Sequence, residues 1–208
     1  MSVSGLSFRP ATPDDASFAA RLMYNIACRD FDTLFTGLAA GLSPHDVVET
    51  FYRAPGGMFS WHNTEIALHD GLPAGIITAY SVASRSGSAA WLARAAAQLG
   101  ARALVLLAWR GVIVARAVQR NTPGSWFIAF VGVDPTQQSL GIGSSLIERS
   151  IQKARRAGCS CVELDVDVDN PRAQALYERL GFHVVHTERQ RTFSLVVESR
   201  RMTLQLHA

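Results

Sequence analysis

The sequence lacks several features that identify common classes of protein. Its three cysteines, Cys28, Cys159 and Cys161, form neither an even set for disulfides nor a paired C-x-x-C metal motif. We therefore expect free thiols, as in a reducing cytosol. No basic stretch followed by an apolar one stands near the N-terminus, so we expect no secretory signal peptide.

Strong net charge and long apolar runs are also missing. A net charge of +3 is too small to indicate nucleic-acid binding. The most apolar run, residues 103–118, is interrupted by Arg110 and Arg116 and is shorter than the ~20 residues of a membrane span. The histidines show no ligand spacing, so no metal site is predicted. We expect a cytoplasmic protein that binds neither nucleic acid nor membrane.

One long segment contains no acidic residue. Residues 85–122 hold no Asp or Glu but six arginines, namely Arg85, Arg94, Arg102, Arg110, Arg116 and Arg120. The segment is alanine-rich and then almost continuously apolar, which predicts a helical insertion. Two strands at 104–108 and 112–114 are the alternative, because short apolar runs are ambiguous by period alone. The arginines favour either an anionic ligand or a homodimer contact.

The remaining chain reads as a mixed α/β domain. The predicted strands are residues 6–8, 64–68, 74–81, 126–133, 161–168, 182–186 and 200–206, and the predicted helices are residues 13–27, 44–52, 144–157 and 171–180. Asp70-Gly71 indicates a hairpin, for which we expect a loop longer than two residues. Thr12 and Asn170 are expected helix N-caps, each followed by a proline. We predict one domain over residues 1–208, with the insertion at 85–122.

The most informative motif runs from Val133 to residue 147, where a strand leads through Gly141 and Gly143 directly into a helix. Glycines let backbone amides turn inward, and the helix start supplies free N–H donors, which together suit phosphate oxygens. A plain strand-to-helix turn is the alternative. A P-loop is excluded because no lysine precedes Ser144, and a dinucleotide fingerprint is excluded because Leu146 replaces its third glycine.

Two longer motifs resemble the GCN5-related N-acetyltransferase (GNAT) superfamily. Gln138-x-x-Gly141-x-Gly143 after V-D-P resembles its acetyl-CoA pyrophosphate loop, and residues 164–182, with L-Y-x-x-x-G-F at their end, match its second motif without a gap. Residues 8–16 resemble its opening strand and turn. The resemblance implies a mixed, mostly antiparallel central sheet with flanking helices and splayed central strands.

The resemblance also implies acetyl-CoA as cosubstrate, without a metal. The pantetheine arm would bind the backbone of the strand end, in a slot beside residues 161–168, and the pyrophosphate would bind the loop. The residues that the resemblance assigns to acetyl-CoA binding are Phe130, Val131, Val133, Gln138, Ser139, Leu140, Gly141, Ile142, Gly143, Ser144 and Asn170.

Tyr177 has two interpretations. Its spacing from Ala173, Leu176 and Leu180 is that of a core tyrosine on the apolar face of a helix. The GNAT resemblance instead implies the general acid that protonates the departing CoA thiolate. A phenol of ordinary pKa ~10 can donate to a thiolate as charge develops on it.

A general base is harder to assign. Glu163, Asp165 and Asp167 alternate with apolar residues, so they share one face of their strand. In some protein N-terminal acetyltransferases of the superfamily, an acid at the place of Asp165 is the base. The alternatives are a solvent-facing acidic edge, carboxylates paired with the arginines of residues 85–122, or a water chain as base.

These features predict an N-acyltransferase that moves an acetyl group from acetyl-CoA to an amine acceptor. The amine, of a small molecule or a peptide, would attack directly in a ternary complex with no covalent enzyme intermediate. The six arginines favour an anionic acceptor, or else a homodimer interface. The alternative function is a non-catalytic acyl-CoA-binding regulatory module of the same fold.

Overall fold

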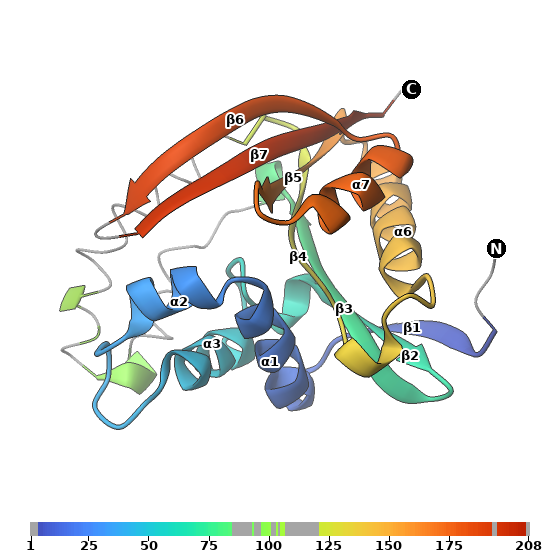
Figure 1. Ribbon diagram of the computed structural model, residues 1–208. Helices are drawn as coiled ribbons and strands as arrows, with labels where there is room; N and C mark the ends of the chain where they lie inside the picture. Colours follow the sequence, from blue (N-terminus) through green and yellow to red (C-terminus); the bar gives the residue numbers. More distant parts are fainter. Residues whose placement is uncertain are drawn as a thin grey trace.

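A computed structural model of the chain describes residues 4–84, 93, 97–100, 103, 105–106, 121–192 and 195–206. Strands in this part of the chain form a seven-stranded sheet in the order β1-β2-β3-β4-β5-β7-β6 (Figure 1). All neighbouring strands are antiparallel except β4 and β5, which run parallel. The predicted mixed, mostly antiparallel sheet is confirmed.

Helices cover both faces of this sheet. Figure 1 shows α1, α2 and α3 on one face and α6 and α7 on the other. The strands are β1 (Leu6–Pro10), β2 (Thr64–His69), β3 (Leu72–Ser81), β4 (Trp126–Val133), β5 (Cys161–Asp167), β6 (His183–Thr192) and β7 (Leu195–Gln205), and the helices are α1 (Ala16–Ile26), α2 (Cys28–Phe35), α3 (Pro44–Arg53), α6 (Ile142–Arg156) and α7 (Pro171–Arg179). Short 3-10 turns lie at η1 (Pro13–Asp15), η2 (Trp61–Asn63), η3 (Val82–Ser84) and η4 (Pro135–Gln137).

Polar side chains fix where two of the helices begin. Ser43 and Asp46 form a capping box at α3, because the Asp46 carboxylate accepts from the Ser43 N–H at 2.8 Å and the Ser43 hydroxyl accepts from the Asp46 N–H. Asn170 Oδ1 accepts from the Ala173 N–H at 3.1 Å, and Pro171 is the first residue of α7. These contacts satisfy N–H groups that a helix start otherwise leaves free. The predicted cap at Asn170 is confirmed.

A bulge in β4 sends its apolar side chains to both faces of the sheet. Phe130 pairs with Thr78 and Ile128 with Ala79, so Ala129 is the extra residue of the bulge. In a regular strand Ile128 and Phe130 would share a face. Here Ile128 belongs to the hydrophobic cluster with α6, and Phe130 belongs to the cluster with α1, α2 and α3.

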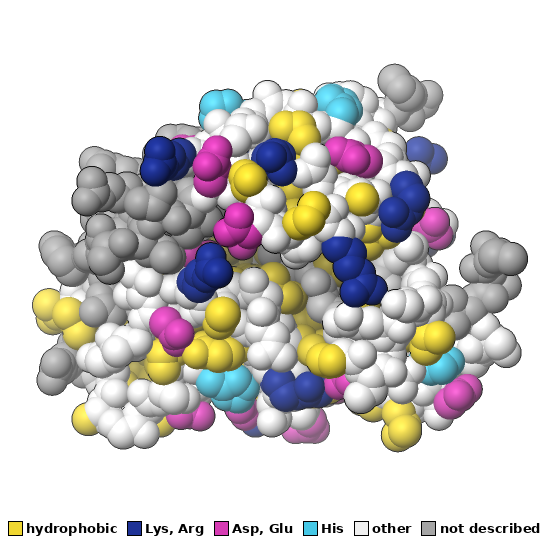
Figure 2. Space-filling view, in the orientation of Figure 1, with side chains coloured by type: hydrophobic (Ala, Val, Ile, Leu, Met, Phe, Trp, Pro, Cys, Tyr) yellow, Lys and Arg dark blue, Asp and Glu magenta, His cyan; other side chains and the backbone are white. Residues whose placement is uncertain are grey.

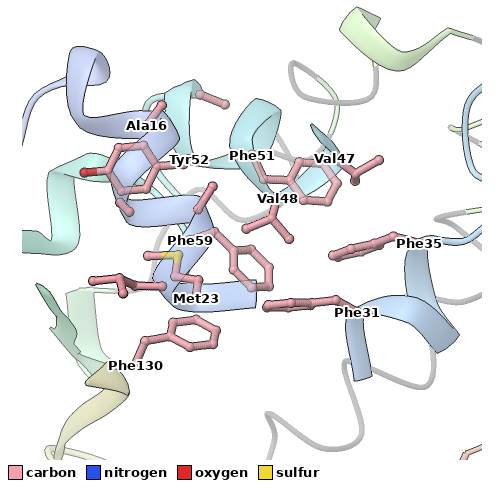
Figure 3. Packing of buried hydrophobic residues seen from close by; sticks show 14 of the residues in the cluster. Ala16, Met23, Phe31, Phe35, Val47, Val48, Phe51, Tyr52, Phe59 and Phe130 are labelled. Atoms are coloured by element: carbon pink, nitrogen blue, oxygen red, sulfur yellow. The ribbon is translucent and has the colours of Figure 1, made fainter. Parts of the chain in front are cut away.

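The cluster on the α1–α3 face is rich in aromatic rings (Figure 3). The ring centroids of Phe31 and Phe35 of α2 are 5.5 Å apart. Phe130 of β4 lies 6.0 Å from Phe31 and 5.7 Å from Phe59. Burial of such a side chain contributes about 1.5–3 kcal/mol. This packing holds α2 against the end of β4.

The structure differs from the sequence predictions in several places, and β6 and β7 are longer than the predicted strands 182–186 and 200–206. The loop between β2 and β3 has only two residues, Asp70 and Gly71, where we expected more. Both have positive φ, 51° and 80°, which is the conformation that a two-residue hairpin turn requires. The sequence also did not predict α2, because its eight residues include Asp30 and Asp32 and are too few to establish a helical period.

The predicted insertion at 85–122 falls mostly outside the described residues, and all six of its arginines do. Of its described members, Leu99 and Ala103 are helical and buried in the cluster on the α1–α3 face. Val105 and Leu106 are also helical. Among the helices of the described residues, none is both long and apolar enough to cross a bilayer.

Candidate active site

A gap opens in the sheet between β4 and β5. The two strands pair only at residues 126–128 of β4 and 162–164 of β5. Beyond these residues, β4 continues along β3 to Val133, and β5 continues along β7 to Asp167. The β4 edge at 129–133 therefore has no strand partner on the β5 side, so its backbone groups can bind an extended ligand. The predicted splay of the central strands is confirmed.

The predicted pantetheine edge presents its backbone to this gap. The Phe130 side chain packs in the aromatic cluster, whereas Val131 and Val133 pack toward α6 and α7. Gly132 allows α1 to lie close, since a Cβ there would be 3.1 Å from both Leu22 and Ile26 side-chain atoms. The side chains of these strand residues thus position the edge.

The loop after β4 turns sharply into α6. Ser139 and Gly141 have φ of 68° and 82°, and no side chain caps the helix at Gly141. The Ser145 N–H is the first to bond back, to Gly141 O at 3.1 Å. The N–H groups of residues 142–144 therefore have no acceptor among the described residues. Free N–H groups at the positive end of a helix fit the phosphate oxygens of CoA.

The predicted phosphate-binding residues contribute in different ways. Gln138, Ser139 and Leu140 are exposed, so their side chains can meet a ligand. The Ile142 side chain is buried in the cluster beneath α6, which leaves only its backbone for binding. The loop therefore presents exposed side chains at residues 138–140, next to a backbone that is anchored by the buried Ile142 side chain.

Asp134 connects this loop to α1. Its carboxylate accepts from Arg21 Nη2 at 2.9 Å, and from the Thr136 N–H at 3.0 Å and hydroxyl at 2.7 Å. The hydrogen bond from Arg21, followed by those from Thr136, lowers the pKa of Asp134 to about 2. Arg21 offsets the negative charge that Asp134 would otherwise bring to the loop.

Tyr177 lies half-buried on the inner face of α7. Its ring packs against the same cluster as Val131 and Val133, and its centroid is 6.1 Å from that of Phe182. Burial raises the pKa of the phenol to about 12, so it stays protonated at ordinary pH. Its hydroxyl has no hydrogen-bond partner in the described part of the chain. The ring is thus structural, while the hydroxyl is available to a ligand.

Asp165 is held by an arginine of the neighbouring strand. Arg201 of β7 donates to both carboxylate oxygens, from Nε at 2.5 Å and Nη2 at 2.9 Å. Its guanidinium also lies over the Phe127 ring at 5.3 Å and donates to Asn121. Proton transfer to Asp165 would compete with this ion pair. The role of Asp165 as base stays a prediction.

Glu163 anchors the segment that leads into β4. Its buried carboxylate accepts from the Thr122 N–H at 3.0 Å, the Thr122 hydroxyl at 2.6 Å and the Ser125 hydroxyl at 2.9 Å. A buried carboxylate with several donors is strongly held. Glu163 is therefore a structural residue of the face that it shares with Asp165.

Asp167 stands at the open end of β5. Burial raises its pKa, with Arg29 of α2 opposing the change and Asp169 and Asp165 adding to it. Burial also raises the pKa of Asp30 of α2, and the charge of Asp167 adds to that increase. Two carboxyl groups with raised pKa values therefore interact, one on α2 and one at the end of β5.

Comparison with known proteins gives the family. The chain matches the acetyltransferase (GNAT) family over residues 23–182, more than half of its length. The protein belongs to the GNAT acetyltransferase family. The predicted family is confirmed, and the loop at residues 138–144, Asn170 and Tyr177 all lie within the matched range.

Curated relatives of this GNAT protein match it over shorter stretches. A mycothiol acetyltransferase of Kocuria rhizophila is 41% identical over 68 residues, which is 33% of this chain and 22% of that protein. An N-alpha-acetyltransferase of Arabidopsis thaliana is 36% identical over 72 residues, 35% of this chain and 38% of that protein. The chain thus spans well under half the length of either relative.

Solved structures share the fold over nearly the whole chain. An N-acetyltransferase from Staphylococcus aureus aligns with a TM-score of 0.67 at 16% identity, covering 95% of this chain and 100% of that one. A putative acetyltransferase from Salmonella typhimurium, solved with its cofactor acetyl-CoA, aligns with a TM-score of 0.57 at 18% identity, covering 98% and 95%. At these identities the likeness concerns the fold alone.

Sequence reasoning missed several residues around the gap. Arg21 and Arg201 act through partners that are 113 and 36 residues away, so no local pattern reveals them. Arg172 of α7 donates to Ser139 in the loop between β4 and α6, which is also a tertiary contact. Asp167 was visible in the alternating acidic strand, but the effect of Arg29 of α2 on its pKa was not. In the described residues, no group of three His, Cys, Asp or Glu is placed to hold a metal ion.

Proposed function

We propose that this GNAT protein transfers the acetyl group of acetyl-CoA to the amine of a small molecule or peptide, by direct attack in a ternary complex. The observation that carries the proposal is the gap where β4 leaves β5, because it ends at a helix start with free N–H groups. Such a gap can hold an extended arm along its free strand edge and phosphates at the helix start. The family match supports the same function.

The chain's own residues have separate tasks in this reaction. Bound acetyl-CoA supplies the thioester that donates the acetyl group. The backbone of residues 130–133 would hold the pantetheine arm, and Gln138, Ser139, Leu140 and the N–H groups of residues 142–144 would hold the diphosphate. Asn170 would steady the same region through the start of α7. Fixing the donor beside an acceptor lowers the entropic part of the barrier.

Tyr177 is the proposed proton donor to the departing sulfur. An ordinary thiol has a pKa of ~8.5, so full transfer from a phenol with a pKa of about 12 is uphill in the ligand-free protein. The phenol therefore acts first as a hydrogen-bond donor, as negative charge develops on sulfur. The amine loses one proton in the reaction and the sulfur gains one.

Two carboxylates are candidates for the base that removes the amine proton. Asp165 must release a bond from Arg201 before it can accept a proton. Asp167 lies two residues further along the same face, and burial raises its pKa, which makes its carboxylate more basic than an ordinary aspartate. We favour Asp167. The predicted anionic acceptor and homodimer contact rest on arginines outside the described residues and stay predictions.

A thermal-shift measurement with acetyl-CoA tests the proposed site. Gly141→Asp places bulk and negative charge beside the free N–H groups, so it should abolish the shift that the wild type shows. Gly158→Asp is the matched control, because Gly158 also has positive φ, 69°, and lies beyond the other end of α6. An equal shift in Gly141→Asp and wild type would contradict the site.

Release of free thiol then separates the two candidate functions. Acetyl-CoA incubated with a panel of amines and peptides should release thiol with at least one acceptor. Tight binding without thiol release from any acceptor would support a non-catalytic acyl-CoA-binding module.

A further inference from the structure

Arg172 extends from the first turn of α7 to the phosphate loop. It is the second residue of the helix, and its Nη2 donates to Ser139 Oγ at 3.1 Å. Ser139 is an exposed loop residue with the left-handed φ of 68°. The contact places the start of α7 beside a loop that is 33 residues away in sequence.

This position is unfavourable for an arginine unless a negative charge is close. The start of a helix carries partial positive charge, which repels a cation. The first turn of α7 contains no acidic residue. The partner that the described residues offer the guanidinium is the neutral hydroxyl of Ser139. The positive charge of Arg172 is therefore not neutralised by the part of the chain that the structure describes.

The start of α6 adds to the same positive region. Its first turn also lacks an acidic residue, and the N–H groups of residues 142–144 are free within the described chain. Residues 135–145 contain no Asp or Glu. Figure 2 shows Lys and Arg side chains between α7 and the start of α6 on the face in view. Two helix starts and a guanidinium thus lie around one loop, whose nearest acid in sequence, Asp134, is already paired with Arg21.

We propose that Arg172 binds a phosphate group of CoA, in addition to the backbone of the loop. The assignment rests on the proposed function and names a binding residue that the family motifs did not supply here. A guanidinium has five N–H donors in a planar fork, and Ser139 engages one of them. The remaining donors match two oxygens of a phosphate. The diphosphate and the 3′-phosphate of CoA share this chemistry.

Titration calorimetry with CoA tests the assignment in wild type, Arg172→Gln and Arg179→Gln. Arg179 lies in the last turn of the same helix, so its replacement removes the same charge away from the loop. We expect Arg172→Gln to raise the Kd about tenfold, as the loss of a charge-assisted hydrogen bond does. Arg179→Gln should change the Kd less than about twofold. Melting curves without ligand show whether both variants are folded.

A second titration, with 3′-dephospho-CoA, distinguishes the two phosphate groups. If Arg172→Gln loses as much affinity for 3′-dephospho-CoA as for CoA, Arg172 binds the diphosphate. If it loses affinity for CoA alone, Arg172 binds the 3′-phosphate. Either result supports the assignment.

Three results would overturn it. The first is an Arg172→Gln variant that binds CoA as tightly as the wild type. The second is a Ser139→Ala variant that reproduces the whole loss, because Arg172 would then act only by holding the loop. The third is a wild type that binds no CoA, which would overturn the proposed function together with this assignment. Tight wild-type binding with an unchanged Arg172→Gln variant leaves the proposed function standing.

Discussion

At the residue scale, the Tyr177 ring packs against the hydrophobic cluster beneath α6, whereas its hydroxyl makes no hydrogen bond to the described residues. Tyr177→Phe keeps the ring in its cluster and removes only the proton donor. We expect kcat to fall by about 10²–10⁴-fold, the usual contribution of a general acid, while the KM for acetyl-CoA changes little. Steady-state kinetics with an accepted amine measure both.

Tyr52→Phe is the control for this prediction. Tyr52 is fully buried in the other cluster, and its hydroxyl also has no partner among the described residues. Its removal should leave kcat unchanged. If Tyr177→Phe turns over as fast as Tyr52→Phe, another group or a water protonates the sulfur.

Asp167 gives a pH dependence with a definite direction. A base works when it is deprotonated, so activity is lost as pH falls through its pKa. Because burial raises the pKa of Asp167, the acidic limb of kcat/KM should lie at higher pH than an ordinary aspartate would give. Asp167→Asn should remove that limb and lower kcat/KM at neutral pH. Full pH–rate profiles of both proteins provide the measurement.

Asp165→Asn separates the two candidate bases. Its replacement breaks the ion pair with Arg201, so some loss of stability is expected whatever its role. An acidic limb that persists in Asp167→Asn but disappears in Asp165→Asn would assign the base to Asp165. A limb that persists in both variants would favour a water chain.

At the scale of elements, the ion pair of Arg21 and Asp134 connects α1 to the end of β4. Because the folded pKa of Asp134 is lowered to about 2, its stabilisation is present above the unfolded pKa of ~3.9. It is lost as pH falls through about 2. The difference in unfolding free energy between wild type and Asp134→Asn should therefore be full at pH 7, shrink once the pH falls below about 4, and disappear only as the pH falls through about 2.

Urea unfolding at a series of pH values measures this convergence. Asp14→Asn is a suitable control, because Asp14 is an exposed aspartate near the start of α1. A difference between wild type and Asp134→Asn that stayed constant from pH 7 to pH 3 would contradict a stabilising ion pair.

Elements with strong local signals could be predicted from the sequence, and contacts between elements could not. Asn170-Pro171 at one end and Gly181 at the other define α7, because caps are local. The strand-to-helix turn at Gly141 is equally local. The pairing of Asp165 with Arg201 depends on the register of β5 and β7, and the contact of Arg172 with Ser139 depends on how α7 packs. The spacing of residues along a single sequence does not show which elements contact each other.

The bulge at Ala129 shows the same limit within a single strand. The run of β-favouring residues at 126–133 correctly indicates a strand, but the two-residue period of a regular strand would place Ile128 and Phe130 on one face. The extra residue in the pairing with β3 moves Phe130 to the aromatic cluster. The residues themselves therefore predicted the strand, and the family resemblance predicted the gap, whereas the side on which each side chain packs required the structure.

At the scale of the whole molecule, the gap divides the sheet into two parts with few shared backbone contacts. Strands β1 to β4 form one part and β5 to β7 the other, and β4 and β5 pair at only three positions. The cluster beneath α6 spans this division, because it contains residues of both β4 and β5. Packing beneath α6 thus holds the two parts together across the gap, and a ligand in the gap would touch both.

Ligand binding should therefore stabilise the backbone on both sides of the gap. At a concentration of 100 times its Kd, a ligand stabilises the folded state by about 2.7 kcal/mol, which for a domain of this size corresponds to a rise in Tm of about 5–10 °C. Hydrogen–deuterium exchange with acetyl-CoA should show added protection in peptides covering residues 129–133 and 139–145, and in α7, while β1 and β2 change little. In Gly141→Asp the same peptides should exchange as they do without ligand. Protection confined to β6 and β7, with none at residues 129–133, would show that acetyl-CoA binds elsewhere on the molecule.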